Sequence, residues 1–245
     1  MIIIGGGVGP LAGVDLHRLI IEQTKTDGKD QDHLRVLHLS CSDLIPDRTD
    51  SLLQGNPEAP ALGMARILKA AESCCDEMFM QGYVGIPCNT FHSPAIWDRF
   101  KQALKESGSH LQVLNMIEST IEYMRESFPE ITKIGLMSTT GTRETGVYSD
   151  SLHSSGYTVL ESAYQNRVHD MIYHTEWGIK AKIPVSQEAL QIGIDTLDEL
   201  IEKGAEAVIL GCTELPLALT EDTYKDIPLI NPVRLLAKEL IRKVQ

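Results

Sequence analysis

Short apolar runs alternate along the chain with longer stretches whose apolar residues recur at helical spacing. The runs predict strands at Ile2–Ile4, Val36–Leu39, Met78–Met80 with Val84–Ile86, Val113–Met116, Ile134–Met137, Thr158–Glu161, Ala207–Leu210 and Pro228–Ile230. The helical stretches are Ala61–Cys75, Ile117–Ser127, Ser186–Lys203 and Pro232–Val244. Alternation of fully apolar strands with amphipathic helices is typical of an α/β fold with parallel sheets.

The two halves of the chain repeat each other. MIIIGGGVGPLAGVD resembles KIGLMSTTGTRETGVYSD, and VGIPCNTFH resembles VILGCTELP. We therefore predict two pseudo-symmetric lobes, each a mostly parallel sheet flanked by helices, with the active site between them. Residues 1–115 plus 229–245 form the lobe that carries Cys88, and residues 116–228 form the lobe that carries Cys212.

The first glycine cluster raises a separate possibility. Gly7–Ala12 fits the dinucleotide fingerprint GxGxx(G/A), which is weak evidence alone. The acidic residue expected about 20 positions further on is Asp27, in a polar loop, and Asp43 is the remaining candidate. Glycines that let the backbone approach a substrate explain the cluster better, and a tight strand–helix turn without a ligand explains it equally well. Pro10 is placed well to begin the helix.

Composition and charge exclude several classes of protein. The formal net charge is −12 over 245 residues, which disfavours binding to nucleic acid. No apolar run approaches the length of about 20 residues that a membrane span needs, and no basic segment precedes the N-terminal run, so we expect a cytoplasmic protein. The 5 cysteines are odd in number and lack CxxC spacing, which predicts reduced thiols rather than disulfides or a thiolate zinc site.

Two of the cysteines share a context that suggests chemistry. Cys88 and Cys212 each end a predicted strand and precede hydroxyl or amide residues and an expected helix. A helix N-terminus favours a thiolate, which at pH 7 costs about 2 kcal/mol to form from an ordinary thiol. Two such residues on opposite sides of a small ligand could remove a proton from one face of a carbon and return one to the other, without a metal. We expect Cys41, Cys74 and Cys75 to be core residues.

The same segments carry a family resemblance over nearly the whole chain. GGGVGPLA, IPDRT, PCNTFH, STTGT, GIKA and GCTELP resemble motifs of aspartate racemases in the aspartate/glutamate racemase superfamily, which works without pyridoxal phosphate. PCNT together with GCTE is the specific pair. The resemblance implies a homodimer, no cofactor and Cys88 and Cys212 as the acid/base pair.

The resemblance also implies substrate contacts. Asn89, Thr90 and Thr213 match contacts to the α-carboxylate and amino group, Arg48 matches the grip on the side-chain carboxylate, and Lys180 assists it. Thr49 and Thr140, in the IPDRT and STTGT motifs, and Glu214 complete the expected substrate-binding set. Phe91 replaces a usual small residue, and we expect it to affect the shape of the pocket. Asp47 either orients Arg48 or caps a turn, and His92 either polarises the Cys88 thiol or packs.

The sequence thus predicts an amino-acid racemase acting on aspartate through thiolate/thiol proton transfer at Cα. The alternatives are another isomerase of the superfamily (glutamate or broad-specificity racemase, hydantoin racemase, maleate isomerase), a non-catalytic amino-acid-binding protein, or a nicotinamide dehydrogenase.

Overall fold

The computed structural model describes residues 1–245, which form two compact units. Unit 1 comprises Met1–Ser119 and Val233–Gln245, and unit 2 comprises Thr120–Pro232. The lobe boundaries expected from the sequence lie four residues earlier at both crossings, at 115 rather than 119 and at 228 rather than 232. The difference arises because helix α5 (Met116–Ser127) crosses the first boundary and helix α11 (Pro232–Val244) begins at the second.

Unit 1 is built on a four-stranded parallel sheet in the order β2–β1–β3–β4. Its strands are β1 (Ile2–Gly6), β2 (Val36–Ser40), β3 (Tyr83–Gly85) and β4 (Gln112–Val113). Its other elements are α1 (Pro10–Gln23), α2 (Arg48–Leu53), α3 (Glu58–Glu77), α4 (Pro94–Glu106) and the 3₁₀ turns η1 (Asp30–Asp32), η2 (Ser42–Leu44) and η3 (Thr90–His92).

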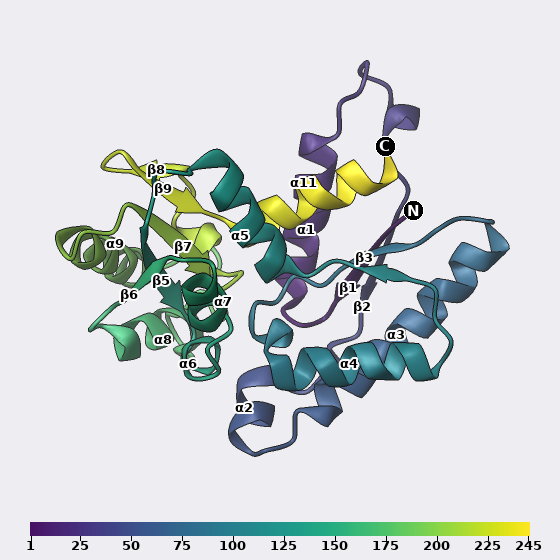
Figure 1. Cartoon of the computed structure of the whole chain (residues 1–245), viewed down its shortest axis with the longest axis horizontal. Coiled ribbons are helices and arrows are strands. Elements are labelled where there is room, and N and C mark those ends of the chain that lie inside the picture. The colour runs from purple at the N-terminus through teal and green to yellow at the C-terminus, as the bar shows by residue number, and fades with distance from the viewer. The chain divides into compact units, whose positions relative to one another are not determined.

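Alternate residues of β1 enter two apolar clusters, one on each face of this sheet. Ile3 packs in the cluster formed with α3 and α4. Ile2 and Ile4 pack in the cluster formed with α1 and α11. Figure 1 shows these two pairs of helices on opposite faces of the sheet. A strand covered on both faces is apolar at every position, which explains the uninterrupted isoleucine run.

Unit 2 repeats the same strand order in a five-stranded sheet, β6–β5–β7–β9–β8. Its strands are β5 (Lys133–Ser138), β6 (Thr158–Glu161), β7 (Ala207–Gly211), β9 (Ile227–Ile230) and the antiparallel edge strand β8 (Thr223–Tyr224). Its helices are α6 (Thr140–Glu144), α7 (Ser149–Ser154), α8 (Gln165–Tyr173), α9 (Gln187–Glu202) and α10 (Leu215–Ala218). The sequence prediction of an α/β fold with two mainly parallel, helix-flanked sheets is confirmed, and β3 and β7 hold equivalent places in the two sheets.

Two predicted strands differ from the structure. Val113–Met116 overlaps β4 only at Val113, because helix α5 begins at Met116. Met78–Met80 forms a turn after α3 instead, because Phe79 takes a left-handed backbone conformation (φ 53°) that ends the helix. Its side chain is 98% exposed, so the apolar triplet does not mark a buried segment. The antiparallel strand β8 was not predicted, because two residues carry no readable alternation.

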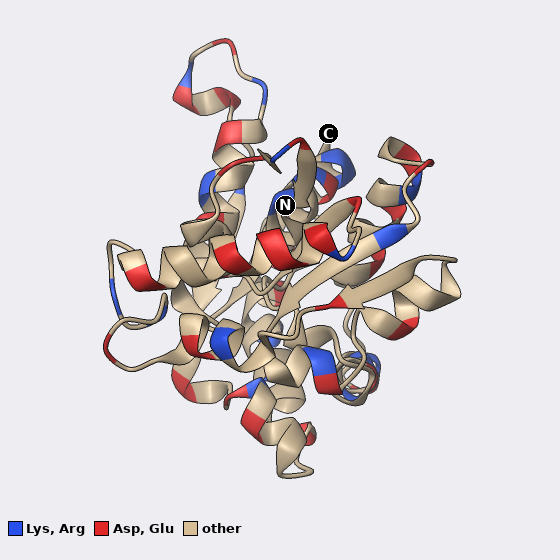
Figure 2. Ribbon diagram, turned by 90° about the vertical axis from the view of Figure 1, so that its left-hand side faces the viewer, with Lys and Arg blue, Asp and Glu red and all other residues tan.

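Most charged residues lie on the helices and loops of the ribbon, with acidic and basic residues interspersed (Figure 2). No helix is both long enough and apolar enough to cross a membrane.

Candidate active site

Cys88 lies just beyond the carboxyl end of β3, where ligands of parallel sheets gather. It is 7% exposed, and the next residues turn through η3 rather than entering a long helix. His92 closes this turn, because its Nδ1 donates to the Cys88 carbonyl at 2.8 Å. Burial lowers the pKa of His92 to about 4, so the ring is neutral near pH 7. It packs against Trp97 with ring centroids 4.6 Å apart and an interplanar angle of 31°. Of the two expected roles for His92, the structure supports packing, since the ring contacts Trp97 and the Cys88 backbone and does not bind the sulfur.

Phe91 is a core residue of unit 1. Its side chain is fully buried in the apolar cluster of unit 1 and meets Phe100 edge-on with ring centroids 5.3 Å apart. Phe91 turns into the core, where a large apolar side chain is favoured, and it lies in the same apolar cluster as Cys88. An effect of Phe91 on the shape of the substrate pocket stays a prediction.

Arg48 begins helix α2 and is 8% exposed. Its guanidinium donates to the carbonyl oxygens of Val8 and Pro46. Asp47 is the N-cap of the helix, since its carboxylate accepts from the Asp50 amide at 3.0 Å, which decides between its two expected roles. Helix α2 packs against η3, so Arg48 and Thr49 lie on an element next to the turn that carries Asn89 and Thr90.

The N-terminal glycine turn is a close-packed connection that also supplies a partner for Arg48. Gly7 has a φ of 86°, and a Cβ there would lie 2.7 Å from the Cys41 amide nitrogen. Pro10 is the first residue of α1, as predicted. Val8, between them, offers its carbonyl to Arg48. The glycines thus allow the backbone after β1 to approach the loop after β2 and to hold Arg48.

Cys212 lies at the end of β7 in unit 2, in direct contact with an acid. Its sulfur donates to Oε2 of Glu214 at 3.1 Å, and the Thr213 hydroxyl donates to the same oxygen at 3.0 Å. The other oxygen, Oε1, forms an ion pair with Lys180 Nζ at 2.8 Å. The side chain of Glu214 is 6% exposed and that of Lys180 is 29% exposed. The Thr213 hydroxyl uses its proton in the bond to Glu214. Its oxygen therefore remains free to accept a hydrogen bond, for example from an ammonium group.

The loop that carries Lys180 is fixed against helix α8. The amides of Ile179 and Lys180 donate to the Met171 and Ile172 carbonyls at 2.9 and 3.1 Å. Gly178 makes this approach possible, because a Cβ there would lie 2.6 Å from both the backbone nitrogen and oxygen of His174. Lys180 Nζ also lies 5.0 Å from the centre of the Tyr173 ring. The backbone contacts of this loop with α8 therefore position Lys180 for its ion pair with Glu214.

Thr140 is linked to Lys180 indirectly, through the rings of His169 and Tyr173. Its hydroxyl shares a hydrogen bond of 3.1 Å with His169 Nδ1. The His169 ring stacks on Tyr173 with centroids 4.8 Å apart, and Tyr173 in turn covers Lys180. His169 and Tyr173 were not predicted as site residues, because neither belongs to a motif and only folding brings helix α8 against the GIKA loop.

The electrostatics of Cys212 differ from the expectation of a thiolate at a helix start. Helix α10 has only 4 residues and begins after Glu214, so it offers little dipole to the sulfur. Burial and the neighbouring Glu214 carboxylate raise the pKa of the Cys212 thiol well above its usual value, and Lys180 opposes them only in part. Of the other cysteines, Cys75 is buried, Cys41 is half-buried and Cys74 is exposed, so the expectation of a core residue is wrong for Cys74.

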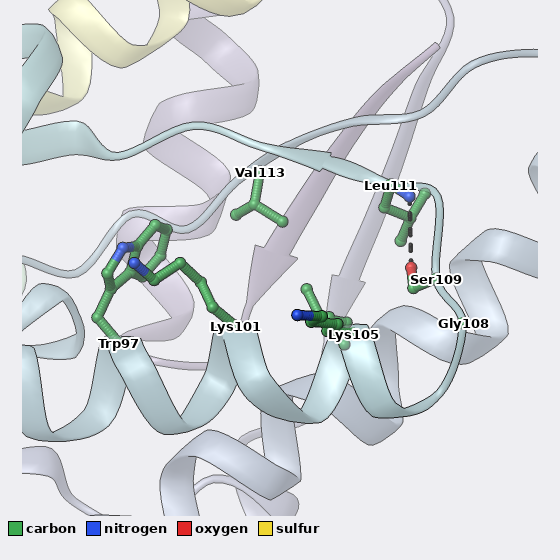
Figure 3. Close-up of a pocket in the computed structure, with 8 residues that line it drawn as sticks. Trp97, Lys101, Lys105, Gly108, Ser109, Leu111 and Val113 are labelled. Carbon is green, nitrogen blue, oxygen red and sulfur yellow. Dashed lines mark hydrogen bonds between the residues drawn. The ribbon is translucent and has the colours of Figure 1, made fainter.

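The structure brings the predicted residues together within each unit. In unit 1 the turn η3, which begins at Thr90, lies beside the helix that starts with Arg48 and Thr49. In unit 2 Lys180, Cys212 and Thr213 each contact Glu214. A surface hollow of about 430 Å³ in unit 1 contains none of them. It lies between α4 and the segment leading into β4, alongside Trp97, Lys101 and Lys105 (Figure 3).

Known proteins share both the sequence pattern and this fold. The family model described as Asp/Glu/Hydantoin racemase matches residues 6–240. The solved structure of Picrophilus torridus aspartate racemase is 26% identical, with a TM-score of 0.79 over 99% of this chain and 93% of that chain. Glutamate racemase of Francisella tularensis, solved with D-glutamate, is 16% identical and shows the fold, with a TM-score of 0.63 over 99% of this chain and 79% of that chain.

A curated relative, glutamate racemase of Carboxydothermus hydrogenoformans, is 26% identical over 133 residues, which are 53% of this chain and 48% of that protein. The alignment thus spans about half the length of that relative. Two mainly parallel sheets with the same strand order, each with a cysteine after its central strand, define an α/β fold that this chain shares with solved racemases. The chain belongs to the Asp/Glu/hydantoin racemase family, and it is a racemase of that family.

Proposed function

We propose that the protein interconverts L- and D-aspartate without a cofactor, with Cys88 and Cys212 as the two acid/base residues. The observation that carries the proposal is the repeated placement of a buried cysteine after the equivalent strands β3 and β7, each followed by hydrogen-bonding side chains. Membership of the racemase family supports the reaction class, and the 26% identity to an aspartate racemase supports the substrate.

The proposed reaction moves one proton off Cα and another onto it. A thiolate at one cysteine takes the Cα proton, so an S–H bond forms as the C–H bond breaks. The electron pair stays on the substrate as an enolate-like carbanion, and the thiol of the other cysteine then gives its proton to the opposite face. The mechanism requires both sulfurs to reach the same Cα.

Arg48 and Lys180 are the proposed partners of the substrate carboxylates. Arginine matches a carboxylate with a planar pair of donors, and Arg48 is held in place by two backbone carbonyls. Lys180 is already paired with Glu214, so its charge is partly neutralised before a substrate arrives. In this proposal Arg48 makes the main contact with the side-chain carboxylate, and Asn89, Thr90 and Thr213 bind the α-carboxylate and amino group.

The test is proton NMR of L-aspartate with the purified protein in deuterium oxide, combined with chiral analysis of the product. We expect loss of the Cα proton signal and appearance of D-aspartate, and both Cys88→Ala and Cys212→Ala should abolish inversion. Cys74→Ala, at an exposed cysteine outside the site, is the matched control and should keep wild-type activity. Inversion by a Cys212→Ala protein would exclude the two-base mechanism.

Glutamate is the second candidate substrate, because a glutamate racemase is also among the 26% identical relatives. A parallel assay with glutamate separates the two: a larger kcat/KM with glutamate than with aspartate would overturn the proposed specificity. The homodimer implied by the family resemblance stays a prediction, for which analytical ultracentrifugation is the direct measurement.

A further inference from the structure

The Glu214 carboxylate joins two groups that the proposed reaction uses separately. Its Oε2 accepts the proton of Cys212 Sγ at 3.1 Å, and its Oε1 lies 2.8 Å from Lys180 Nζ. An ionised carboxylate only accepts hydrogen bonds, so the sulfur in this arrangement carries its proton. The buried site therefore holds Cys212 as a thiol.

Ionisation of Cys212 would place two negative charges side by side in a buried site with one cation beside them. The groups facing the sulfur and its partner are Glu214, Lys180, the Tyr173 ring over Lys180 and His169 stacked on Tyr173. Three nearby cations are engaged with carboxylates of α9: Arg167 with Asp195, Lys225 with Asp198 and Lys203 with Glu199. Lys180, already paired with Glu214, is the cation that acts on the Cys212 sulfur.

Cys88 has different surroundings. The neutral His92 ring binds its carbonyl oxygen, and no carboxylate of unit 1 hydrogen-bonds to its sulfur. The two cysteines occupy equivalent places in the two sheets, but only Cys212 has an acid on its sulfur.

We propose that Glu214 is a positioning residue that keeps Cys212 protonated while the site is empty, so that Cys212 enters the reaction as proton donor and Cys88 as proton acceptor. The inference rests on the proposed two-base racemase. After inversion of one enantiomer, Cys88 is a thiol and Cys212 is a thiolate beside Glu214. The resting form returns when Cys88 loses its proton to water and Cys212 takes one up from water. The ion pair with Lys180 keeps Glu214 ionised, since burial alone would favour its neutral form.

This asymmetry has a kinetic consequence. L- and D-aspartate have equal free energies, so kcat/KM is the same for both enantiomers. One enantiomer reacts with the resting form, in which Cys212 carries the proton, and the other needs the rarer form, in which Cys88 carries it. The second enantiomer should therefore have a higher KM than the first and a kcat that is higher by the same factor. We expect that factor to exceed about tenfold, which corresponds to a difference of about one pH unit in thiol affinity for protons.

The first experiment does not depend on activity. The rate of alkylation of Cys212 by iodoacetamide is followed by mass spectrometry of its peptide as a function of pH, and each profile is normalised to its high-pH plateau. In the wild-type protein we expect a midpoint above that of an ordinary thiol. Glu214→Gln should lower the midpoint by about one pH unit or more. Glu214→Asp keeps the charge and should retain a raised midpoint.

Glu188→Gln, at an exposed carboxylate on α9, is the matched control and should leave the profile unchanged. An ordinary midpoint in the wild-type protein, or a Glu214→Gln profile identical to it, overturns the inference. Should Glu214→Gln fail to fold, the wild-type protein can be tested by the infrared S–H band that is lost in Cys212→Ala. This band should persist at about pH 9.5, where an ordinary thiol is mostly ionised, and its absence at that pH overturns the inference.

The second experiment measures kcat and KM for each enantiomer. We expect the enantiomers to differ by a common factor in wild type and to converge in Glu214→Gln, a pattern that simple loss of structure would not produce. The two proposals fail separately. A raised midpoint for Cys212 without racemisation of aspartate would support the role of Glu214 and exclude the proposed function. Racemisation of aspartate with an ordinary midpoint would support the proposed function and exclude the role of Glu214.

Discussion

Arg48 shows how a single residue connects three segments of unit 1. It begins helix α2 and donates to carbonyls in the glycine turn and in the loop before the helix. We expect Arg48→Lys to lower kcat/KM for aspartate about 10- to 100-fold, because lysine cannot reproduce the planar pair of donors. Steady-state kinetics with both enantiomers measures the effect.

Arg66→Lys, at an exposed position on α3, is the control for the general effect of this replacement. Wild-type kinetics in Arg48→Lys would show that the guanidinium does not bind the side-chain carboxylate.

His92 predicts a specific dependence of stability on pH. Burial lowers its pKa to about 4 in the folded protein, whereas the unfolded chain binds the proton near pH 6.5. Between these values the unfolded state holds more protons, so the stability conferred by neutral His92 is present above pH 6.5 and is lost as the pH falls towards 4. The free energy of unfolding should decrease by about 3 kcal/mol from this residue over that window.

His92→Gln removes the titrating ring and should flatten this part of the profile from urea unfolding at several pH values. His33→Gln, at an exposed histidine, should leave the slope as in wild type. An unchanged slope in His92→Gln would mean that other groups cause the acid destabilisation.

At the residue scale, the sequence could identify what depends on local context. Cys88 and Cys212 were found because each follows an apolar strand and because the context occurs twice. The contact of Glu214 with both Cys212 and Lys180 could not be predicted, because Lys180 lies on a loop whose position depends on Gly178 and helix α8. The direction of Phe91 was also unreadable, since one residue in a tight turn can face either the core or a ligand.

At the scale of elements, the glycine turn after β1 provides a direct comparison. Gly7 and Gly55 both have positive φ, 86° and 69°, but only Gly7 has backbone atoms close to where a Cβ would lie. Both alanine variants bear the strain of a left-handed conformation, and Gly7→Ala must also displace the loop at Cys41. We expect Gly7→Ala to lower the free energy of unfolding by about 1–3 kcal/mol more than Gly55→Ala, as measured by chemical denaturation.

Gly7→Ala should also raise KM for aspartate, because the turn carries the Val8 carbonyl that holds Arg48. Equal losses of stability in the two variants would show that the loop at Cys41 adapts to the added methyl group without strain.

Element prediction succeeded where burial on both faces made the pattern plain. The strands β1, β5 and β7 are buried along nearly their whole length and were readable as apolar runs. Met78–Met80 has the same apolar character but lies at a helix end, where the conformation of Phe79 and not hydrophobicity determines the path of the chain. Composition alone cannot separate these two cases.

At the scale of the whole molecule, each unit has its own core, and the end of the chain returns to the first. Helix α11 places Val233, Leu236 and Leu240 in the cluster that covers β1 in unit 1. Leu236 also faces β3, since a Cβ on Gly85 would lie 3.2 Å from its Cδ2. The stability of the strand that leads to Cys88 therefore depends on residues that are last in the sequence.

This arrangement predicts that the two units can be loosened separately. Leu236→Ala and Leu200→Ala each remove a fully buried leucine, the first from the core of unit 1 and the second from that of unit 2. Each should cost about 2–5 kcal/mol. In hydrogen exchange, Leu236→Ala should accelerate the amides of β1 and β3 and leave β5 and β7 nearly unchanged, and Leu200→Ala should do the reverse. Equal acceleration of amide exchange in all four strands, in either variant, would mean that the chain opens as one cooperative unit. Helix α11 would then stabilise both β3 and β7, the strands that precede the two cysteines, and not β3 alone.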